Sequence, residues 1–288
     1  MSTSIFICLV SAIFWALFDL TRKLSLEIVN AKILLLLFSL IQIIIFSIWC
    51  IKDSFSFNFI SYLIPGFTLV LLGIFSAIIF LKSIKESELS LTIPLLSFSP
   101  LFSSIFAFIL LGETLNVKQY LGVFTIIFGT LVLYAEKLES SLLITSFLNI
   151  KNNLSAKLMI LVSFCWSLTP ILDKICLKHS SMNMHGLVQA IFTFIILFFF
   201  SFKDIKQIKT KKFKNLKLIF VTVSVGTLAT VLQFYAIILN FVPIMESIKR
   251  AVGQFCAVGF GKLFFKERVS SQKIIGVSVL SLGVYLIV

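Results

Sequence analysis

The chain has 288 residues, of which 59% are hydrophobic and only 13% are charged, and its mean hydropathy is +1.10. This composition excludes a soluble globular protein, because too few polar side chains are available to cover its surface. The formal net charge of +13 could indicate nucleic-acid binding, but the basic residues lie in short gaps between apolar runs and form no basic aromatic platform. We therefore expect an integral membrane protein with no nucleic-acid partner.

Apolar segments of about 17 to 24 residues follow one another along the whole chain. Backbone groups in hydrocarbon must be bonded internally, and barrel strands would be about half this length, so the segments are predicted to be helices. Residues Met1–Ser4 are few and uncharged, which predicts that the first helix is retained and not cleaved as a signal peptide. The sequence thus predicts an all-α integral membrane protein with ten transmembrane helices. The expected spans are Ser4–Thr21, Lys32–Ile51, Phe59–Leu81, Leu89–Leu111, Val117–Ala135, Leu158–Cys176, Met184–Phe202, Leu216–Leu239, Val242–Phe265 and Gln272–Val288.

The two halves of the chain carry matching patterns. The segment LLGETLNVKQYLGVFTIIFGTLVLY, from Leu110, aligns with FFKERVSSQKIIGVSVLSLGVYLIV, from Phe264, at a constant offset of 154 residues. Glu113 thereby matches Glu267. Further matches at similar offsets are Gly122 with Gly276, Gly129 with Gly283, Trp15 with Trp166, Lys23 with Lys174, and Gly73 with Gly226.

These matches divide the chain into a first five-helix repeat over 1–135, a linker over 136–157 and a second five-helix repeat over 158–288. Because five is odd, the second repeat must cross the membrane in the opposite sense to the first. Two inverted repeats are typical of a secondary transporter, whose site lies between the halves.

The ninth span, Val242–Phe265, carries charges among apolar neighbours. A charge at membrane depth costs from about 2.5 to more than 10 kcal/mol, so it needs a partner, a water-filled cavity or a ligand. Helical spacing puts Glu246, Lys249 and Arg250 on one face, and Gly253 continues that face. The pattern favours a ligand cavity followed by a close helix contact. The alternative is a purely structural pair of Glu246 with Arg250, which would leave Lys249 unexplained.

The first and sixth spans offer a second group of candidates. Asp19 lies late in the first span and could line a cavity or carry a coupling proton, or could instead form an interfacial cap with Arg22 or Lys23. Asp173 and Lys174, late in the sixth span, have the same alternatives. Trp15 and Trp166 could stack on a substrate, or could pack between helices and anchor them at the membrane interface.

The remaining polar residues indicate no chemistry. Gln42, Gln189 and Gln233 are mid-span amides that could bind a polar substrate or bond across helices. His179 and His185 lack metal-like neighbours and are predicted to be solvated. The five cysteines show no CxxC spacing, and phosphate-loop, HExxH and GxSxG motifs are missing from the sequence. We therefore expect no metal site, no cofactor and no catalytic residues, and a protein that is not an enzyme.

Basic residues are distributed unequally between the two sides. The gaps on the side reached after the first span hold 18 Lys and Arg residues, and those on the other side hold four. The positive-inside rule then places both termini outside the cytoplasm, in a cell inner (plasma) membrane. The loop KDIKQIKTKKFKNLK, from Lys203, dominates this count and is interpreted as a topology determinant, with anionic lipid as a second interpretation.

Together these features resemble a known family. An FWA sequence in the first span with basic residues at its end, a GE or KE between the last two spans of each half, and the duplication itself are similar to the drug/metabolite transporter superfamily, specifically its EamA-type ten-helix members. The sequence IKRAVGQF, from Ile248, is also similar to the ninth helix of the triose-phosphate and sugar-phosphate translocators. In those proteins a Lys-Arg pair that matches Lys249 and Arg250 contacts the phosphate of the substrate.

The resulting hypothesis is a secondary transporter that moves a small polar metabolite by alternating access. The resemblance implies that Lys249 and Arg250 bind an anionic group of the substrate, with Glu246 holding them in position. One alternative is a proton-coupled exporter of amino acids or cationic drugs that uses Asp19, Asp173 or Glu246. Another is a non-transporting membrane protein, such as a lipid-handling enzyme or an assembly factor. The expected partners are the small-molecule substrate, membrane lipid and a second copy of the chain in a homodimer.

Overall fold

A computed structural model describes residues 3–86, 93–134, 154–201, 216–267 and 269–287. Most of the predicted linker, most of the basic loop from Lys203 and the start of the fourth predicted span lie outside these residues. The described helices are α1 (Thr3–Ser25), α2 (Ala31–Lys52), α3 (Phe59–Glu86), the 3₁₀ helix η1 (Ile93–Phe98), α5 (Ser99–Leu111), α6 (Val117–Tyr134), α8 (Leu154–Leu177), α9 (Met182–Phe200), α11 (Leu216–Leu239), α12 (Val242–Phe265) and α13 (Ser271–Ile287).

The prediction of an all-α membrane protein is confirmed, and each of the ten predicted spans corresponds to an α-helix. Six of these helices, α1, α2, α3, α8, α9 and α11, are long and apolar enough to cross a membrane by length and composition. Helix α12 is equally long but carries four charged residues. Several boundaries differ by a few residues from the predicted ones; α8, for example, begins at Leu154 and not at Leu158.

The fourth span was wrongly predicted to be one continuous helix. It consists of η1 followed by α5, and the junction falls at Ser99 and Pro100. Proline lacks a backbone N–H and is tolerated in the first turn of a helix, where that group would have no partner inside the helix. The junction therefore starts a new helix at Ser99, and it turns this side chain toward α12.

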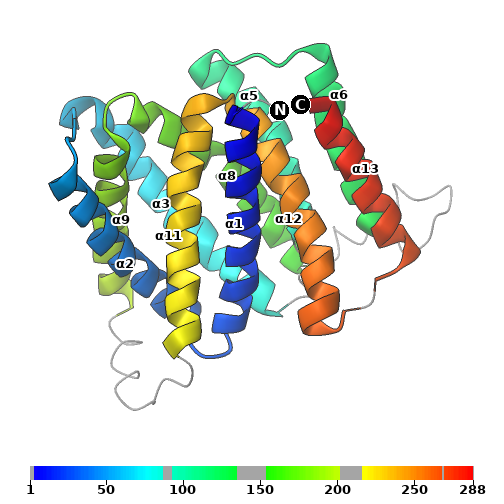
Figure 1. The fold of residues 1–288 in the computed structure, drawn as a ribbon, viewed down its shortest axis with the longest axis horizontal. Coiled ribbons are helices and arrows are strands. Elements are labelled where there is room, and N and C mark those ends of the chain that lie inside the picture. The colour runs from blue at the N-terminus through cyan, green and yellow to red at the C-terminus, as the bar shows by residue number, and fades with distance from the viewer. Residues whose placement is uncertain (1–2, 87–92, 135–153, 202–215, 268, 288) are drawn as a thin grey trace.

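The most extensive helix contacts join the first five helices to the last five. Helices α2 and α9 pack on each other, as do α5 and α12, and α6 and α13. Helix α1 packs on α11 and α12, and α8 correspondingly packs on α3 and α5. Helix α1 begins and α13 ends at the same end of the molecule (Figure 1), as an even number of crossings requires. Each half thus buries its helices mainly against the other half.

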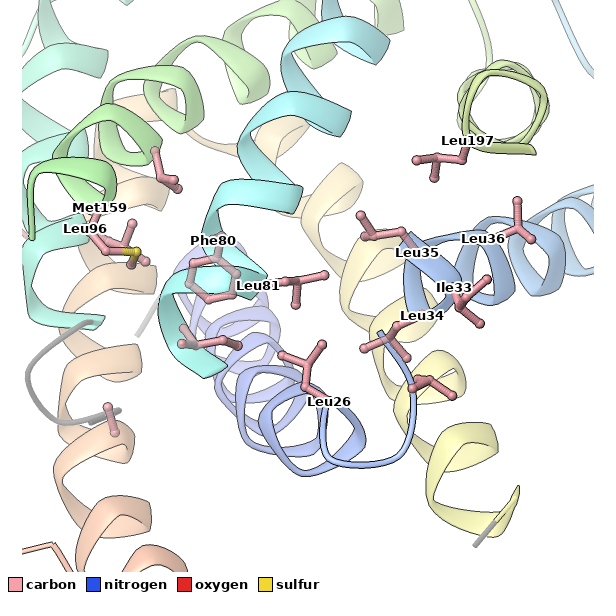
Figure 2. Packing of buried hydrophobic residues seen from close by; sticks show 14 of the residues in the cluster. Leu26, Ile33, Leu34, Leu35, Leu36, Phe80, Leu81, Leu96, Met159 and Leu197 are labelled. Carbon is pink, nitrogen blue, oxygen red and sulfur yellow. The ribbon is translucent and has the colours of Figure 1, made fainter. Parts of the chain in front are cut away.

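An apolar cluster holds several helices together where α1 ends and α2 begins. Figure 2 shows Leu26, after α1, close to Leu34 of α2 and to Phe80 and Leu81 of α3. Met159 of α8 belongs to the same cluster. By contrast, many large apolar side chains elsewhere on the helices are exposed, as expected of surfaces that face lipid.

Helices α6 and α13 approach each other closely through glycines at the positions that match between the two repeats. A Cβ atom added at Gly122 would lie 2.7 Å from the carbonyl oxygen of Gly283, and one added at Gly129 would lie 3.0 Å from that of Gly276. Because backbone atoms occupy these positions, only glycine allows this approach.

This packing gives a stability prediction. Gly122→Ala should lower the free energy of unfolding by about 1–3 kcal/mol, because the new methyl group collides with the backbone of α13. Gly259→Ala is the matched control: nothing lies within 4 Å of its added Cβ atom, so the substitution should leave stability unchanged or raise it slightly. Thermal unfolding of the purified protein in detergent measures both. Equal melting temperatures for the two variants would show that the α6–α13 contact is not tight.

Candidate functional site

A cavity of about 240 Å³ lies between the first five helices and the last five. Its walls come from α1, α2, α3 and η1 of the first half and from α8, α9, α11 and α12 of the second. The predicted site residues that line it are Trp15, Asp19, Trp166, Asp173, Lys249 and Arg250. Gly253 and all three predicted amides, Gln42, Gln189 and Gln233, line it as well.

Glu246 lies behind this wall and is completely buried. Its Oε2 accepts hydrogen bonds from Arg250, at 2.8 Å from Nη2 and 3.1 Å from Nε. Its Oε1 accepts one from Lys249 Nζ at 3.1 Å. The three charges lie within two helical turns of α12, as their spacing predicted, and the carboxylate compensates part of the cost of holding two cations in the membrane.

Ser99 connects this cluster to the other half of the molecule. Its hydroxyl donates to Glu246 Oε2 at 2.9 Å and accepts from Arg250 Nε at 2.8 Å. The residue is fully buried at the junction between η1 and α5. The first residue of α5 therefore supplies a polar partner from the other half of the chain.

Lys249 extends into the cavity between two helices. Its Nζ donates to Gln233 Oε1 of α11 at 2.7 Å and lies 4.8 Å from the centre of the Trp15 ring. Arg250 lies against the other predicted tryptophan, with its guanidinium carbon 5.3 Å from the centre of the Trp166 ring. Both tryptophans thus face cations at cation–π distance. Trp166 also packs on Phe80.

Arg22, predicted only as a topology signal or as a partner of Asp19, lines the cavity. It is 4% exposed, forms an ion pair with Asp19, and its guanidinium lies 4.2 Å from the centre of the Phe18 ring. Asp19 therefore combines two predicted alternatives, since it pairs with Arg22 and also lines the cavity. The spacing in the sequence could have indicated this position. Asp19 and Arg22 follow Trp15 by four and seven residues, which puts all three side chains on one face of a helix.

Two buried donors at this wall have no hydrogen-bond partner within the described part of the chain. They are Trp15 Nε1 and Arg22 Nε. An unpaired buried donor is costly, so such groups are where a polar ligand gains most by binding.

The prediction that His185 is solvated was wrong. It is fully buried in α9, with Nε2 3.0 Å from Asp173 Oδ1 and Nδ1 2.7 Å from the Tyr62 hydroxyl. Gln189, one turn further along α9, donates to the same hydroxyl at 2.9 Å. Tyr62 gave no signal in the sequence, because its partners come from helices far away in the chain. His179, in the turn after α8, is partly exposed.

Lys174 is not among the residues that line the cavity. Its Nζ donates instead to Glu113 Oε1 at 2.6 Å and to the carbonyl oxygen of Asn240 at 2.7 Å. The second carboxylate oxygen of Glu113 accepts from the backbone N–H of Val242, the first residue of α12, at 2.7 Å. This ion pair thus joins α5 and α8 to the start of α12.

The matching residues of the repeat form a second ion pair. Lys23 Nζ lies 3.8 Å from Glu267 Oε1, so each pair takes its lysine from one half and its glutamate from the other. Gly112 and Lys266, which precede the two glutamates, both have left-handed backbone, with φ of 70° and 56°. The turns that carry the glutamates are therefore alike. Because α1 and α8 run in opposite directions, the pairs lie at opposite ends of the helix bundle (Figure 1).

Known proteins resemble this chain over nearly its whole length. A model of the EamA-like transporter family matches residues 2–135 and 153–288. A solved structure described as "Crystal structure of protein" shares 12% sequence identity with this chain and superimposes on it with a TM-score of 0.67. The match covers 99% of this chain and 97% of the chain in that structure. At this identity the similarity shows the fold alone. No curated protein matches the sequence.

The cluster around Glu246 gives a second stability prediction. Glu246→Gln should lower the free energy of unfolding by about 3 kcal/mol, because it removes the negative charge that Lys249 and Arg250 share inside the membrane. Glu27→Gln, at an exposed position between α1 and α2, is the control and should have little effect. Thermal unfolding in detergent measures the difference. If both variants have the same melting temperature as the unsubstituted protein, Glu246 does not stabilise the two cations.

Proposed function

This chain belongs to the EamA-like transporter family, whose members are membrane transporters of the drug/metabolite type, and we propose that it moves a small anionic metabolite by alternating access. The substrate binds in the cavity between the halves. Lys249 and Arg250 hold its anionic group, and Glu246 keeps both cations in place.

The charge of the cluster is the observation that carries this proposal. Arg22, Lys249 and Arg250 are three cations, whereas Asp19 and Glu246 are the two carboxylates paired with them, which leaves one positive charge. Asp173, the carboxylate of α8 that contacts His185, balances this charge over the cavity as a whole, but within the cluster on α1 and α12 the surplus remains and attracts an anion. A cationic substrate would add to it, so the cluster favours an anion.

The tryptophans and amides extend the proposed site beyond the charge. Trp15 presents its unpartnered Nε1 and a ring face that already contacts Lys249. Gln233 can exchange its bond to Lys249 for one to the substrate. These groups suit a ligand with a polar body as well as an anionic end, since each offers a directional hydrogen bond.

The two ion pairs between the halves support alternating access. Lys174–Glu113 and Lys23–Glu267 each tie one half to the other, at opposite ends of the molecule. If one pair opens while the other stays closed, the cavity communicates with one side of the membrane at a time. The distribution of basic residues supports an orientation with the Lys23 end on the cytoplasmic side of a cell inner membrane.

Ligand binding tests the anion site. The purified protein is screened by thermal unfolding against phosphorylated sugars, organic acids, amino acids and cationic drugs. We expect some of the anions to stabilise it, by about 2.7 kcal/mol when the ligand concentration is 100 times the dissociation constant. Lys249→Ala should abolish this stabilisation. Lys262→Ala is the control, because it removes an exposed lysine from the same helix. Stabilisation by cations or amino acids that survives Lys249→Ala would instead place the site among the acids of α1 and α8.

Accessibility of the cavity tests the two ion pairs. In a protein whose native cysteines are replaced, Gly253→Cys places a thiol at the cavity wall, where nothing lies within 4 Å of the added Cβ atom. Lys174→Met should increase labelling by a membrane-impermeant maleimide severalfold from the Glu113 end, and Lys23→Met from the opposite end.

The control for this experiment is Lys178→Met, which removes an exposed lysine near Lys174 and should change neither rate. Vesicles of both orientations distinguish the two ends. Increased labelling from the same end in both lysine variants would contradict the assignment of one ion pair to each end.

A further inference from the structure

A chain of three polar side chains leads from the cavity wall into the protein. Asp173 lines the cavity; His185 and Tyr62 lie behind it, with exposed fractions of 0% and 3%. The imidazole bridges the other two, at 3.0 Å from the carboxylate and 2.7 Å from the hydroxyl. Each member comes from a different helix, α8, α9 or α3.

One arrangement of protons satisfies these hydrogen bonds with a neutral imidazole. The Tyr62 hydroxyl accepts a bond from the Gln189 amide, so its own hydrogen is available to His185 Nδ1. The imidazole then carries its hydrogen on Nε2 and donates it to Asp173. In this arrangement His185 is neutral, and Asp173 is negatively charged at the cavity wall.

One proton can be added to this chain with little rearrangement. The Tyr62 hydroxyl can pass its hydrogen to Nδ1 of His185 while its oxygen takes up the incoming proton from the side of Gln189, which lines the cavity. The imidazolium then donates to Asp173 from Nε2 and to the Tyr62 oxygen from Nδ1. One N–H bond is made, the O–H bond of Tyr62 is broken and formed again, and the added positive charge stays on the histidine.

The described side chains that interact with His185 include one charged group, the carboxylate of Asp173. Helix α3 contributes the Tyr62 hydroxyl, which also lies within hydrogen-bonding reach of the Cys176 thiol of α8. Helix α11 contributes the ring of Phe234, and Phe46 of α2 lies against the next residue of α9, Gly186. A positive charge on the imidazole is therefore stabilised by the carboxylate that it contacts.

Asp173 also completes the charge balance of the cavity. Its negative charge cancels the single positive charge left by the cluster on α1 and α12, so the empty site is neutral when His185 is neutral. An anion that enters this neutral site brings a net negative charge into the membrane. A proton on His185 restores neutrality, and each of the two ligands therefore favours the other.

We propose that His185, held between Asp173 and Tyr62, is a proton-binding site of this transporter, and that its protonation accompanies the binding of an anionic substrate. The inference rests on the proposed function for the second ligand. It predicts cotransport of a proton with the anion, in contrast to a simple exchange of anions.

The protonation itself can be measured without a substrate. His179 and His185 are the two histidines of the chain. In a His179→Asn protein labelled with ¹⁵N-histidine, nuclear magnetic resonance should therefore show one imidazole. We expect the neutral form with hydrogen on Nε2 at pH 8.5 and the doubly protonated form at pH 5.5. In the added variant Asp173→Asn, the imidazolium should no longer form at pH 5.5. A His185 that stays neutral at pH 5.5 overturns the proposal.

The link to the anion is tested with sulfate, whose charge does not change over this range. Its dissociation constant should be about tenfold lower at pH 5.5 than at pH 8.5, which lies within the usual range of coupling between two ligands. His185→Gln keeps a donor and an acceptor but does not titrate, so its sulfate affinity should be the same at both pH values.

The outcomes separate this inference from the anion site. If sulfate binds with the same affinity at both pH values, and Lys249→Ala abolishes this binding, the coupling is overturned and the anion site is supported. Sulfate that does not bind at either pH overturns the anion site, and the coupling with it. A pH dependence that persists in His185→Gln assigns the proton to another group and overturns the role of His185.

Discussion

The need to neutralise charge inside a membrane is the constraint on which the rest of this structure depends. Helix α12 carries Glu246, Lys249 and Arg250 at a depth where each isolated charge would be strongly unfavourable. The carboxylate satisfies both cations, and Ser99 completes the cluster from the other half of the chain. Two cations at the cavity wall, Lys249 and Arg250, thus share one buried carboxylate.

The inverted repeat explains why the cavity and the ion pairs lie where they do. Helices of one half pack mainly on helices of the other, so the cavity forms between surfaces that belong to different repeats. The same duplication supplies a lysine late in α1 and in α8, and a glutamate after α5 and after α12. Opposite crossing directions then turn one repeated motif into an ion pair at each end.

The environments of several residues at or behind the cavity wall could not be predicted from the sequence, for a definite reason. Arg22 lies near a helix end, where a basic residue is usually a topology signal, and only packing of Phe18 and Phe80 around it shows that it is buried. His185 follows a turn and looks solvated, yet Asp173 and Tyr62 enclose it from two other helices. Similarly, nothing in the sequence assigned a partner to Ser99. These environments depend on contacts between residues more than a hundred positions apart, or between different helices.

The sequence by itself determined the class of protein, the ten helical spans, the duplication and the charged face of α12. Hydropathy, segment length and helical spacing are local properties, and a lipid environment allows few structures that satisfy the backbone. Only the tertiary structure decided which charges pair, that Lys174 binds Glu113 and does not line the cavity, and that the fourth span breaks at Ser99. Pairing depends on distances between helices, and these distances are set by packing of the whole bundle.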